Sequence, residues 1–128
     1  MKLTTHVPAS VGKPASRFAH GVSVDGAARW LHISGQVGRE LDGSVSGDTR
    51  AQMRRCLSNI IAVLEDAGMG IPNLVKLAVF ITNAQDVALF RETRDQMLDG
   101  HLCASTLLVV SALASPDWTV EIEAVAAG

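Results

Sequence analysis

Residues 74–82 form a nearly continuous apolar run, Leu-Val-Lys-Leu-Ala-Val-Phe-Ile-Thr, which is rich in β-branched side chains. Such a run is typical of a central β-strand that is covered on both faces. Residues 105–112 are also largely apolar on both of their alternating faces. The chain has 128 residues, enough for one domain, and a two-layer monomer would leave one face of this sheet in water. We therefore expect a single domain over residues 1–128 whose sheet packs against other copies of the chain.

Two helical segments separate the strand-like runs. The first follows candidate caps at Asp48 and Thr49 and carries apolar residues at helical spacing over residues 53–64. Gln52 stands three residues after Thr49, which is the spacing of a capping box. The second helix is expected from about residue 86 to residue 98.

The remaining periodic segments predict strands. The expected strands are residues 18–24, 29–37, 74–82, 105–112 and 118–126. Asp25-Gly26 is a strong turn signal and predicts a hairpin of the first two strands, in which His20 and His32 would be cross-strand neighbours. Residues 1–16 mix Pro, Ser and Gly, and we expect an irregular arm there. The order β-β-α-β-α-β-β predicts an α+β fold, a mixed sheet with both helices on one face.

The overall charge and hydropathy exclude several kinds of partner. The net charge is −2, whereas nucleic acid requires a clustered basic face. Arg50, Arg54 and Arg55 form the densest basic cluster, which we interpret as a solvated helical face because they lie on an expected helix. The mean hydropathy of +0.24 is high, but the apolar runs are too short to span a bilayer. No secretory signal is visible, so we expect a cytoplasmic protein.

No metal or cofactor site is expected. The four histidines and two cysteines are scattered without the spacing of metal ligands, and no phosphate-binding glycine motif is present. Cys56 and Cys103 both lie in apolar surroundings. In a cytoplasmic protein they are expected to be buried thiols, neither paired in a disulfide nor nucleophilic.

Acid–base chemistry is the option that remains. Glu121 and Glu123 fall on the same face of the last strand because side chains on a strand alternate with period two. A carboxylate on a strand either faces water or belongs to a site, and the residues alone leave both interpretations open. Desolvation at an interface would raise the pKa of such a carboxylate and let it exchange protons near neutral pH.

Four segments resemble the Rid (YjgF) family. They are Ile33-Ser34-Gly35-Gln36-Val37 before a Gly-rich loop, residues 48–52 leading into 57–65, residues 75–81, and residues 120–126. The resemblance extends over nearly the whole chain from residue 18 onward. It implies a chorismate mutase-like fold and a homotrimer with ligand pockets between adjacent subunits. It also implies a hydrolase that converts reactive enamines and imines, such as 2-aminoacrylate, into ketoacids and ammonia.

The resemblance also implies roles for particular residues. Glu121 matches the family glutamate that positions or activates water, which makes it the expected catalytic residue. Ser34 and Gly35 match ligand-contacting positions, and Phe18 matches an aromatic position that is usually tyrosine. The family arginine that binds the substrate carboxylate is replaced by Ser105, because the pattern Pro-Ala-Arg-Ser reads Cys-Ala-Ser-Thr here.

One arginine could compensate for this replacement. Arg91 falls where many family members carry a pocket-lining asparagine. It could supply a cation to the ligand pocket from a different wall than residue 105. In the simpler interpretation, it is exposed and pairs with Asp95 one turn later. The leading hypothesis is therefore a trimer that binds a small polar metabolite and hydrolyses an enamine or imine, with weak activity on 2-aminoacrylate. The alternatives are a non-catalytic ligand-binding or protein-interaction trimer, and an endoribonuclease or translation inhibitor.

Overall fold

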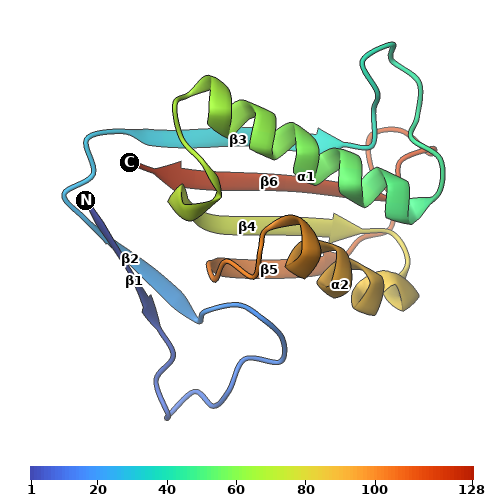
Figure 1. The fold of residues 1–128 in the computed structure, drawn as a ribbon. Coiled ribbons are helices and arrows are strands. Elements are labelled where there is room, and N and C mark those ends of the chain that lie inside the picture. The colour runs from blue at the N-terminus through green and yellow to red at the C-terminus, as the bar shows by residue number, and fades with distance from the viewer.

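A four-stranded mixed sheet forms the centre of the fold in this computed structural model, which describes residues 1–128 (Figure 1). Its strands are β3 (Trp30–Val37), β4 (Leu74–Ile81), β5 (Ala104–Val109) and β6 (Val120–Ala127), in the spatial order β3-β6-β4-β5. β4 and β5 are parallel, whereas β6 runs antiparallel to both β3 and β4. The expected mixed sheet is confirmed.

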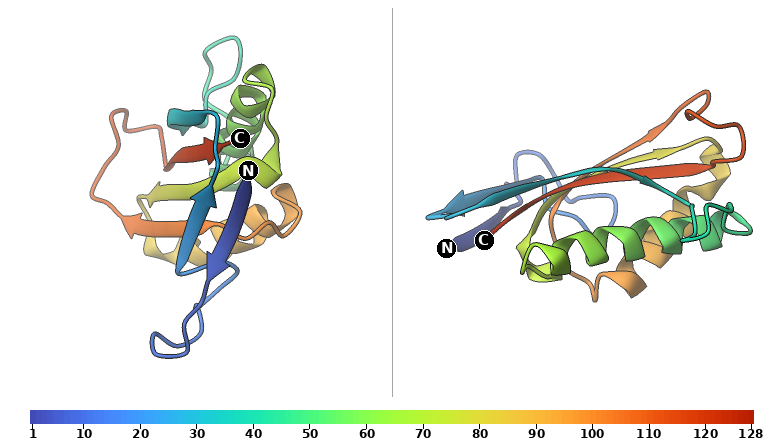
Figure 2. Two further views of the ribbon diagram at one scale, coloured as in Figure 1. Left: turned by 90° about the vertical axis from the view of Figure 1, so that its left-hand side faces the viewer. Right: turned by 90° about the horizontal axis from the view of Figure 1, so that it is seen from above.

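Both helices cover the same face of this sheet. They are α1 (Thr49–Asp66) and α2 (Val87–Met97), and the right-hand view of Figure 2 shows them side by side on one side of the strands. Short 3-10 turns precede β4 (η1, Ile71–Asn73) and α2 (η2, Ala84–Asp86). This layered arrangement is the α+β architecture that the sequence predicts. Neither helix combines the length and the apolar character needed to cross a membrane.

The core lies between the sheet and the two helices, and Phe90 of α2 belongs to it. Every second residue of β6 from Val120 to Ala126 is buried, as the alternation of a strand requires. These side chains share one cluster with α1, which contributes Met53, Cys56, Leu57, Ile60 and Leu64. Burying an aliphatic side chain of this size contributes about 1.5–3 kcal/mol, so this cluster fixes α1 on the sheet. Cys56 and Cys103 are both buried and unpaired, as predicted.

An N-terminal hairpin stands apart from the main sheet. It consists of β1 (Lys2–His6) and β2 (Gly21–Asp25), which pair antiparallel from Lys2↔Asp25 to His6↔Gly21. In Figure 1 it lies beyond the end of the main sheet where β3 begins and β6 ends. A strand therefore lies within residues 1–16, where an irregular arm was expected.

The predicted hairpin between residues 18–24 and 29–37 is wrong. The turn at Gly26, which has φ +68°, is present, but β3 pairs with β6 instead. Arg29 and Gly128 exchange two backbone hydrogen bonds of 2.8 and 3.1 Å just before Trp30 pairs with Ala127. The C-terminal strand thus takes the partner position that the hairpin would have used. His20 and His32 are consequently not cross-strand neighbours.

Candidate functional site

The last strand presents its two glutamates on the face opposite to the helices. Glu121 is half-buried and Glu123 is exposed, while Val120, Ile122 and Ala124 between and beside them are buried in the core. The two carboxylates therefore share one face, as predicted. None of the three ion pairs of the chain involves Glu121, so its charge is free to act on a ligand.

A β-bulge in β3 lies next to Glu121. Ile33 pairs with Ala124, but the next paired residue, Gln36, lies opposite Ile122, so two residues of β3 face one residue of β6. These two residues are Ser34 and Gly35. Ser34 is exposed, and Gly35 lies directly against the carboxyl group of Glu121. Gly35 and Glu121 are therefore in contact, whereas Ser34 lies opposite Glu123 and lines a hollow together with it.

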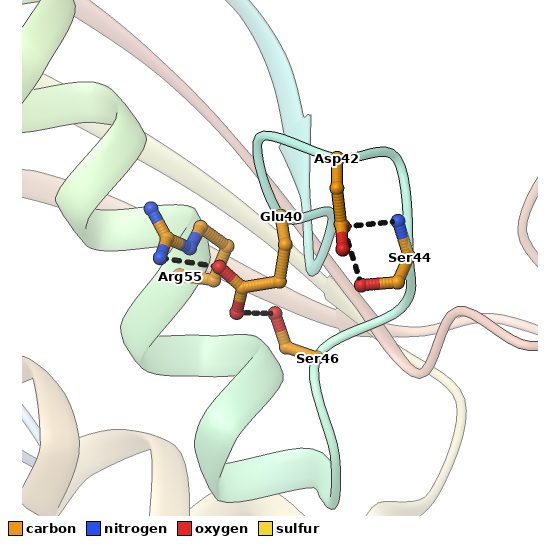
Figure 3. A network of polar contacts seen from close by, with 5 residues as sticks. All are labelled: Glu40, Asp42, Ser44, Ser46 and Arg55. Carbon is orange, nitrogen blue, oxygen red and sulfur yellow. Dashed lines mark hydrogen bonds and ion pairs between the residues drawn. The ribbon is translucent and has the colours of Figure 1, made fainter.

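The loop after β3 is anchored on α1 (Figure 3). Glu40 forms an ion pair with Arg55 of α1 and accepts a 2.7 Å hydrogen bond from the buried hydroxyl of Ser46. Asp42 accepts hydrogen bonds from the side chain and backbone of Ser44, which lower the pKa of Asp42. These contacts hold the C-terminal end of the bulged strand in place.

Two arginines of the basic cluster on α1 are neutralised. Arg55 pairs with Glu40, as described above, and Arg50 lies 3.4 Å from Glu92 of α2. Arg54 is exposed. The cluster is therefore a solvated helical face, as predicted, with acidic partners beside it.

A second group of predicted residues lines a cavity of about 230 Å³ between α2, β5 and the segment before β2. We call it the arginine cavity. Phe18 enters from the segment before β2, Arg91 from α2 and Ser105 from β5. Three residues that are distant in sequence thus meet at one cavity, and Ser105 lies beside an arginine that comes from another element.

Hydrogen bonds to backbone carbonyl groups position the segment that carries Phe18. On one side of Phe18, Arg17 donates from Nε to the carbonyl oxygen of Gly100 at 2.8 Å. On the other side, the amide of Ala19 donates to the carbonyl oxygen of Cys103 at 3.0 Å. The segment is therefore held against the start of β5, with the Phe18 ring in the wall of the cavity.

The sequence analysis missed Arg94. This residue also lines the arginine cavity and is only 4% exposed. Its Nε donates to Asp95 at 3.0 Å, and its guanidinium carbon lies 5.8 Å from the centre of the Phe90 ring. Its Nη2 atom is buried without a hydrogen-bond partner. The signal was available, because Arg94 interrupts the apolar stripe of α2, seven residues after Val87.

The predicted pairing of Arg91 with Asp95 is wrong. Asp95 binds Arg94, and Arg91 takes part in none of the ion pairs of the chain. Arg91 instead contributes to the wall of the arginine cavity. The geometry therefore favours the interpretation in which Arg91 faces a pocket.

The two groups of candidate residues are separate within one chain. Phe18, Arg91 and Ser105 surround a cavity at the β5 edge of the sheet, whereas Glu121 belongs to β6, with β4 in between. Glu121 also points away from the face that α2 covers. One chain alone therefore holds the free carboxylate and the cationic cavity at different places.

Comparison with known proteins then identifies the family. A family model described as Endoribonuclease L-PSP, the Rid or YjgF family, matches residues 9–128. The chain belongs to the Rid family. The resemblance stated from the sequence motifs is thereby confirmed.

Individual Rid proteins cover nearly the same length. The 2-iminobutanoate/2-iminopropanoate deaminase of Escherichia coli K12 is 30% identical over 127 residues, which are 96% of this chain and 93% of the relative. The crystal structure of the Rid protein YyfB from Yersinia pestis has a TM-score of 0.90 at 29% identity and covers 99% of both chains. The structure of E. coli TdcF with bound serine has a TM-score of 0.73 at 30% identity and covers 87% of both chains.

Proposed function

We propose that this Rid protein assembles as a homotrimer in the cytoplasm and hydrolyses an enamine or imine of a small polar metabolite in pockets between subunits. The observation that carries the proposal is the separation of the candidate residues into two incomplete halves. One half, the arginine cavity, has cations and no acid in its wall, and the other half has the free carboxylate of Glu121. Ser34, Gly35 and Glu121 of one copy would complete the cavity of the next copy.

The exposed face of the sheet supports an assembly of copies. Trp30 on β3 is 54% exposed and Leu108 on β5 is 49% exposed. Both point away from the helices, because the adjacent Leu31 and Leu107 pack against the core, and exposed apolar side chains on a sheet face are a common feature of subunit interfaces. In a trimer, neighbouring copies would cover the side of the sheet that is opposite to α1 and α2.

The proposed chemistry needs one group that takes and returns a proton. Glu121 would accept a proton from water as the water oxygen attacks the imine carbon, and it would return this proton to nitrogen as the C=N electron pair moves there, which gives a neutral carbinolamine and an ionised Glu121. The carbinolamine that forms would then pass its hydroxyl proton, through the same carboxylate, to nitrogen. The C–N bond would break, leaving a carbonyl group and ammonia. Imine plus water therefore gives ketone plus ammonia, with no further reactant.

The identity of residue 105 limits the substrate. The E. coli relative is named for 2-iminobutanoate and 2-iminopropanoate. A serine hydroxyl at position 105 has no charge and cannot form the two-pronged contact that a guanidinium makes with a carboxylate. We therefore expect this protein to turn over 2-aminoacrylate and its imine more slowly than a relative with arginine there.

The proposal is tested by generating 2-aminoacrylate and 2-iminobutanoate in place with a dehydratase and following ketoacid release. Wild-type protein should accelerate release, and Glu121→Gln should reduce kcat about 100-fold or more, as removal of a general base does. Glu65→Gln is the matched control, because Glu65 is an exposed glutamate of α1 that takes part in no ion pair. Equal rates for the two variants would contradict the role of Glu121.

A second measurement decides between the proposal and its alternatives. Light scattering at micromolar concentration should give three chains per particle, and a stable monomer would overturn the intersubunit pocket. A trimer that binds ligands but accelerates no imine hydrolysis would be the non-catalytic alternative. The family model is described as Endoribonuclease L-PSP, so RNA cleavage is the other candidate to test, although the net charge of −2 argues against it. Binding of RNA that weakens steeply with salt would support that candidate, and its absence at low salt would exclude it.

A further inference from the structure

We propose that the arginine cavity is a carboxylate-binding site whose anchor is Arg94 of α2. The family resemblance leads us to expect an arginine at position 105 of β5. In this chain, Arg94 of α2 would supply that positive charge instead. The proposal rests on the proposed function only in taking a small organic acid as the ligand. It adds to the proposed function that Arg94 binds the ligand and that the group which Arg94 binds is negatively charged.

The first argument is the burial of Arg94 without sufficient partners. Its side chain is only 5% exposed, and its one hydrogen bond in the chain runs from Nε to Asp95, the adjacent residue. Nη2 is enclosed and donates to nothing. A guanidinium stays protonated at any ordinary pH, so burying it with unused donors is unfavourable unless something else accepts from them. A carboxylate is the acceptor that fits two parallel N–H donors.

The second argument is the composition of the cavity wall. Arg91 lies one turn before Arg94 on α2, and both line the cavity, with no acidic residue beside them in the wall. Ser16 and Ser105 add hydroxyl groups. Asp95 offsets part of the charge of Arg94, but Arg91 has no acidic partner, so these two arginines and two hydroxyls form a region of net positive charge that favours an anion.

The apolar part of the cavity wall indicates what the part of the ligand other than its carboxylate is like. Phe18, Phe90 and Leu107 line the same cavity of about 230 Å³. An acid with a short carbon chain fits both the charge and the apolar surface, and it fits the size of the cavity. We therefore assign short-chain organic acids, including the 2-keto and 2-imino acids, as the ligand class.

Binding measurements test the assignment directly. Propanoate and pyruvate should bind wild-type protein and shift the ¹H–¹⁵N resonance of the Arg94 Nε–H group, whereas the uncharged propanamide should bind about tenfold or more weakly. Arg94→Met, which keeps the volume of the side chain, should weaken both acids by a similar factor. Arg54→Met is the matched control, because Arg54 is an exposed arginine on the other helix. Unchanged affinity in Arg94→Met, or equal affinity for the acid and the amide, would overturn the proposal.

Stability separates a ligand anchor from a structural arginine. If the unused donors of Arg94 await a ligand, ligand-free Arg94→Met should have an unchanged or higher Tm. If Arg94 instead binds a carboxylate of a second copy, the variant should lower Tm and dissociate the oligomer without changing acid affinity. That result would also overturn the proposal.

Moving the cation provides an independent readout. Ser105 and Arg94 line the same cavity, so the double variant Arg94→Met/Ser105→Arg should regain acid affinity that Arg94→Met loses. A folded double variant that stays as weak as Arg94→Met would contradict the assignment of this cavity to the carboxylate.

The outcomes also separate this proposal from the proposed function. Acid binding should persist in Glu121→Gln, since Glu121 does not line the cavity of its own chain, and the Glu121 of a neighbouring copy would face the reacting carbon and not the carboxylate that Arg94 holds. If wild-type protein binds acids through Arg94 but hydrolyses no imine, only the proposed function fails. If it hydrolyses imines and Arg94→Met leaves both acid affinity and KM unchanged, only the present proposal fails.

Discussion

The carboxyl group of Glu121 fills the space that a side chain at position 35 would need. A Cβ atom on Gly35 would lie 2.9 Å from Cδ of Glu121 and still closer to one of its oxygens. The backbone of Gly35 is not in a left-handed conformation, so the absence of a side chain serves the neighbouring strand and not a turn. The glycine of the Ser-Gly-Gln segment and the glutamate of the last strand are therefore one structural unit.

Gly35→Ala should displace the carboxylate and reduce imine hydrolysis. We expect kcat to fall about 10- to 100-fold, because an error of 1 Å in the position of a catalytic group has effects of this size. The fold should survive, since the far end of a flexible side chain can move aside. The measurement is ketoacid release together with thermal unfolding.

Gly47→Ala is the control for this substitution. A Cβ atom at position 47 would meet its nearest neighbour, Cβ of Ala51, at 3.9 Å, which is an ordinary contact. We expect unchanged kcat in this variant. If Gly35→Ala is as active as Gly47→Ala, the coupling between Gly35 and Glu121 has no part in the reaction.

Gln52 should contribute strongly to stability. Its side chain is 3% exposed, accepts from the amide of Thr119 at 3.0 Å and donates to the carbonyl oxygen of Asp117 at 3.1 Å. Gln52→Leu would leave these two backbone groups without partners, and each unmet group costs about 1–3 kcal/mol. We expect the free energy of unfolding to fall by about 2–4 kcal/mol in urea titrations. Gln96→Leu, on the exposed face of α2, should change it by less than about 0.5 kcal/mol.

Patterns within a segment predicted most of the fold. The continuous apolar run of β4 and the helical spacing of α1 each follow from local sequence, and the structure confirms both. Asp48 caps α1 by accepting from the amide of Ala51 at 2.9 Å, as expected for such a residue. Gln52, which has the spacing of a capping box, instead connects α1 to the chain just before β6. Its partners, 65 and 67 residues away, were not visible in a local pattern.

Pairings between distant segments could not be predicted in the same way. The turn at Asp25-Gly26 is present, but β2 pairs with β1 and β3 pairs with the C-terminal β6, which are pairings between segments that no local pattern connects. The site shows the same limit. Glu121, Ser34 and Gly35 came from motif resemblance, whereas Arg94 became a candidate only when its burial and its unused donor were known.

The two thiols should make the protein sensitive to alkali. Burial, and then the charge of Glu121, raises the pKa of Cys56 from 9.0 to about 12. Burial raises the pKa of Cys103 from 9.0 to about 11, although the nearby charge of Arg94 opposes this shift. Above pH 9 the unfolded chain loses these protons while the folded protein keeps them. Their contribution to stability is therefore complete below pH 9 and is lost as pH rises toward 11 and 12.

The expected slope of this loss is measurable. Each thiol should lower the free energy of unfolding by up to about 1.4 kcal/mol per pH unit above pH 9. The chain has no tyrosine, and its lysines, which also titrate near pH 10, are the same in wild-type protein and in the cysteine variant. Urea titrations from pH 8 to 11 should show a shallower slope for Cys56→Ala/Cys103→Ala than for wild-type protein, even though the variant starts from a lower stability. Equal slopes would exclude the thiols as the cause.

Arg91 should strengthen ligand binding less than Arg94 and in a more salt-dependent way. It lines the same cavity but is more exposed than Arg94, and it forms no ion pair in the chain. Charges near solvent interact more weakly and are screened within about 8–10 Å at physiological salt. Arg91→Ala should therefore raise the Kd for pyruvate about three- to tenfold at low salt, and the difference from wild type should shrink at 0.5 M salt. Arg94→Met should lose affinity at both salt concentrations, because its guanidinium is shielded from solvent. If Arg91→Ala leaves affinity and turnover unchanged at low salt, Arg91 does not act on the ligand.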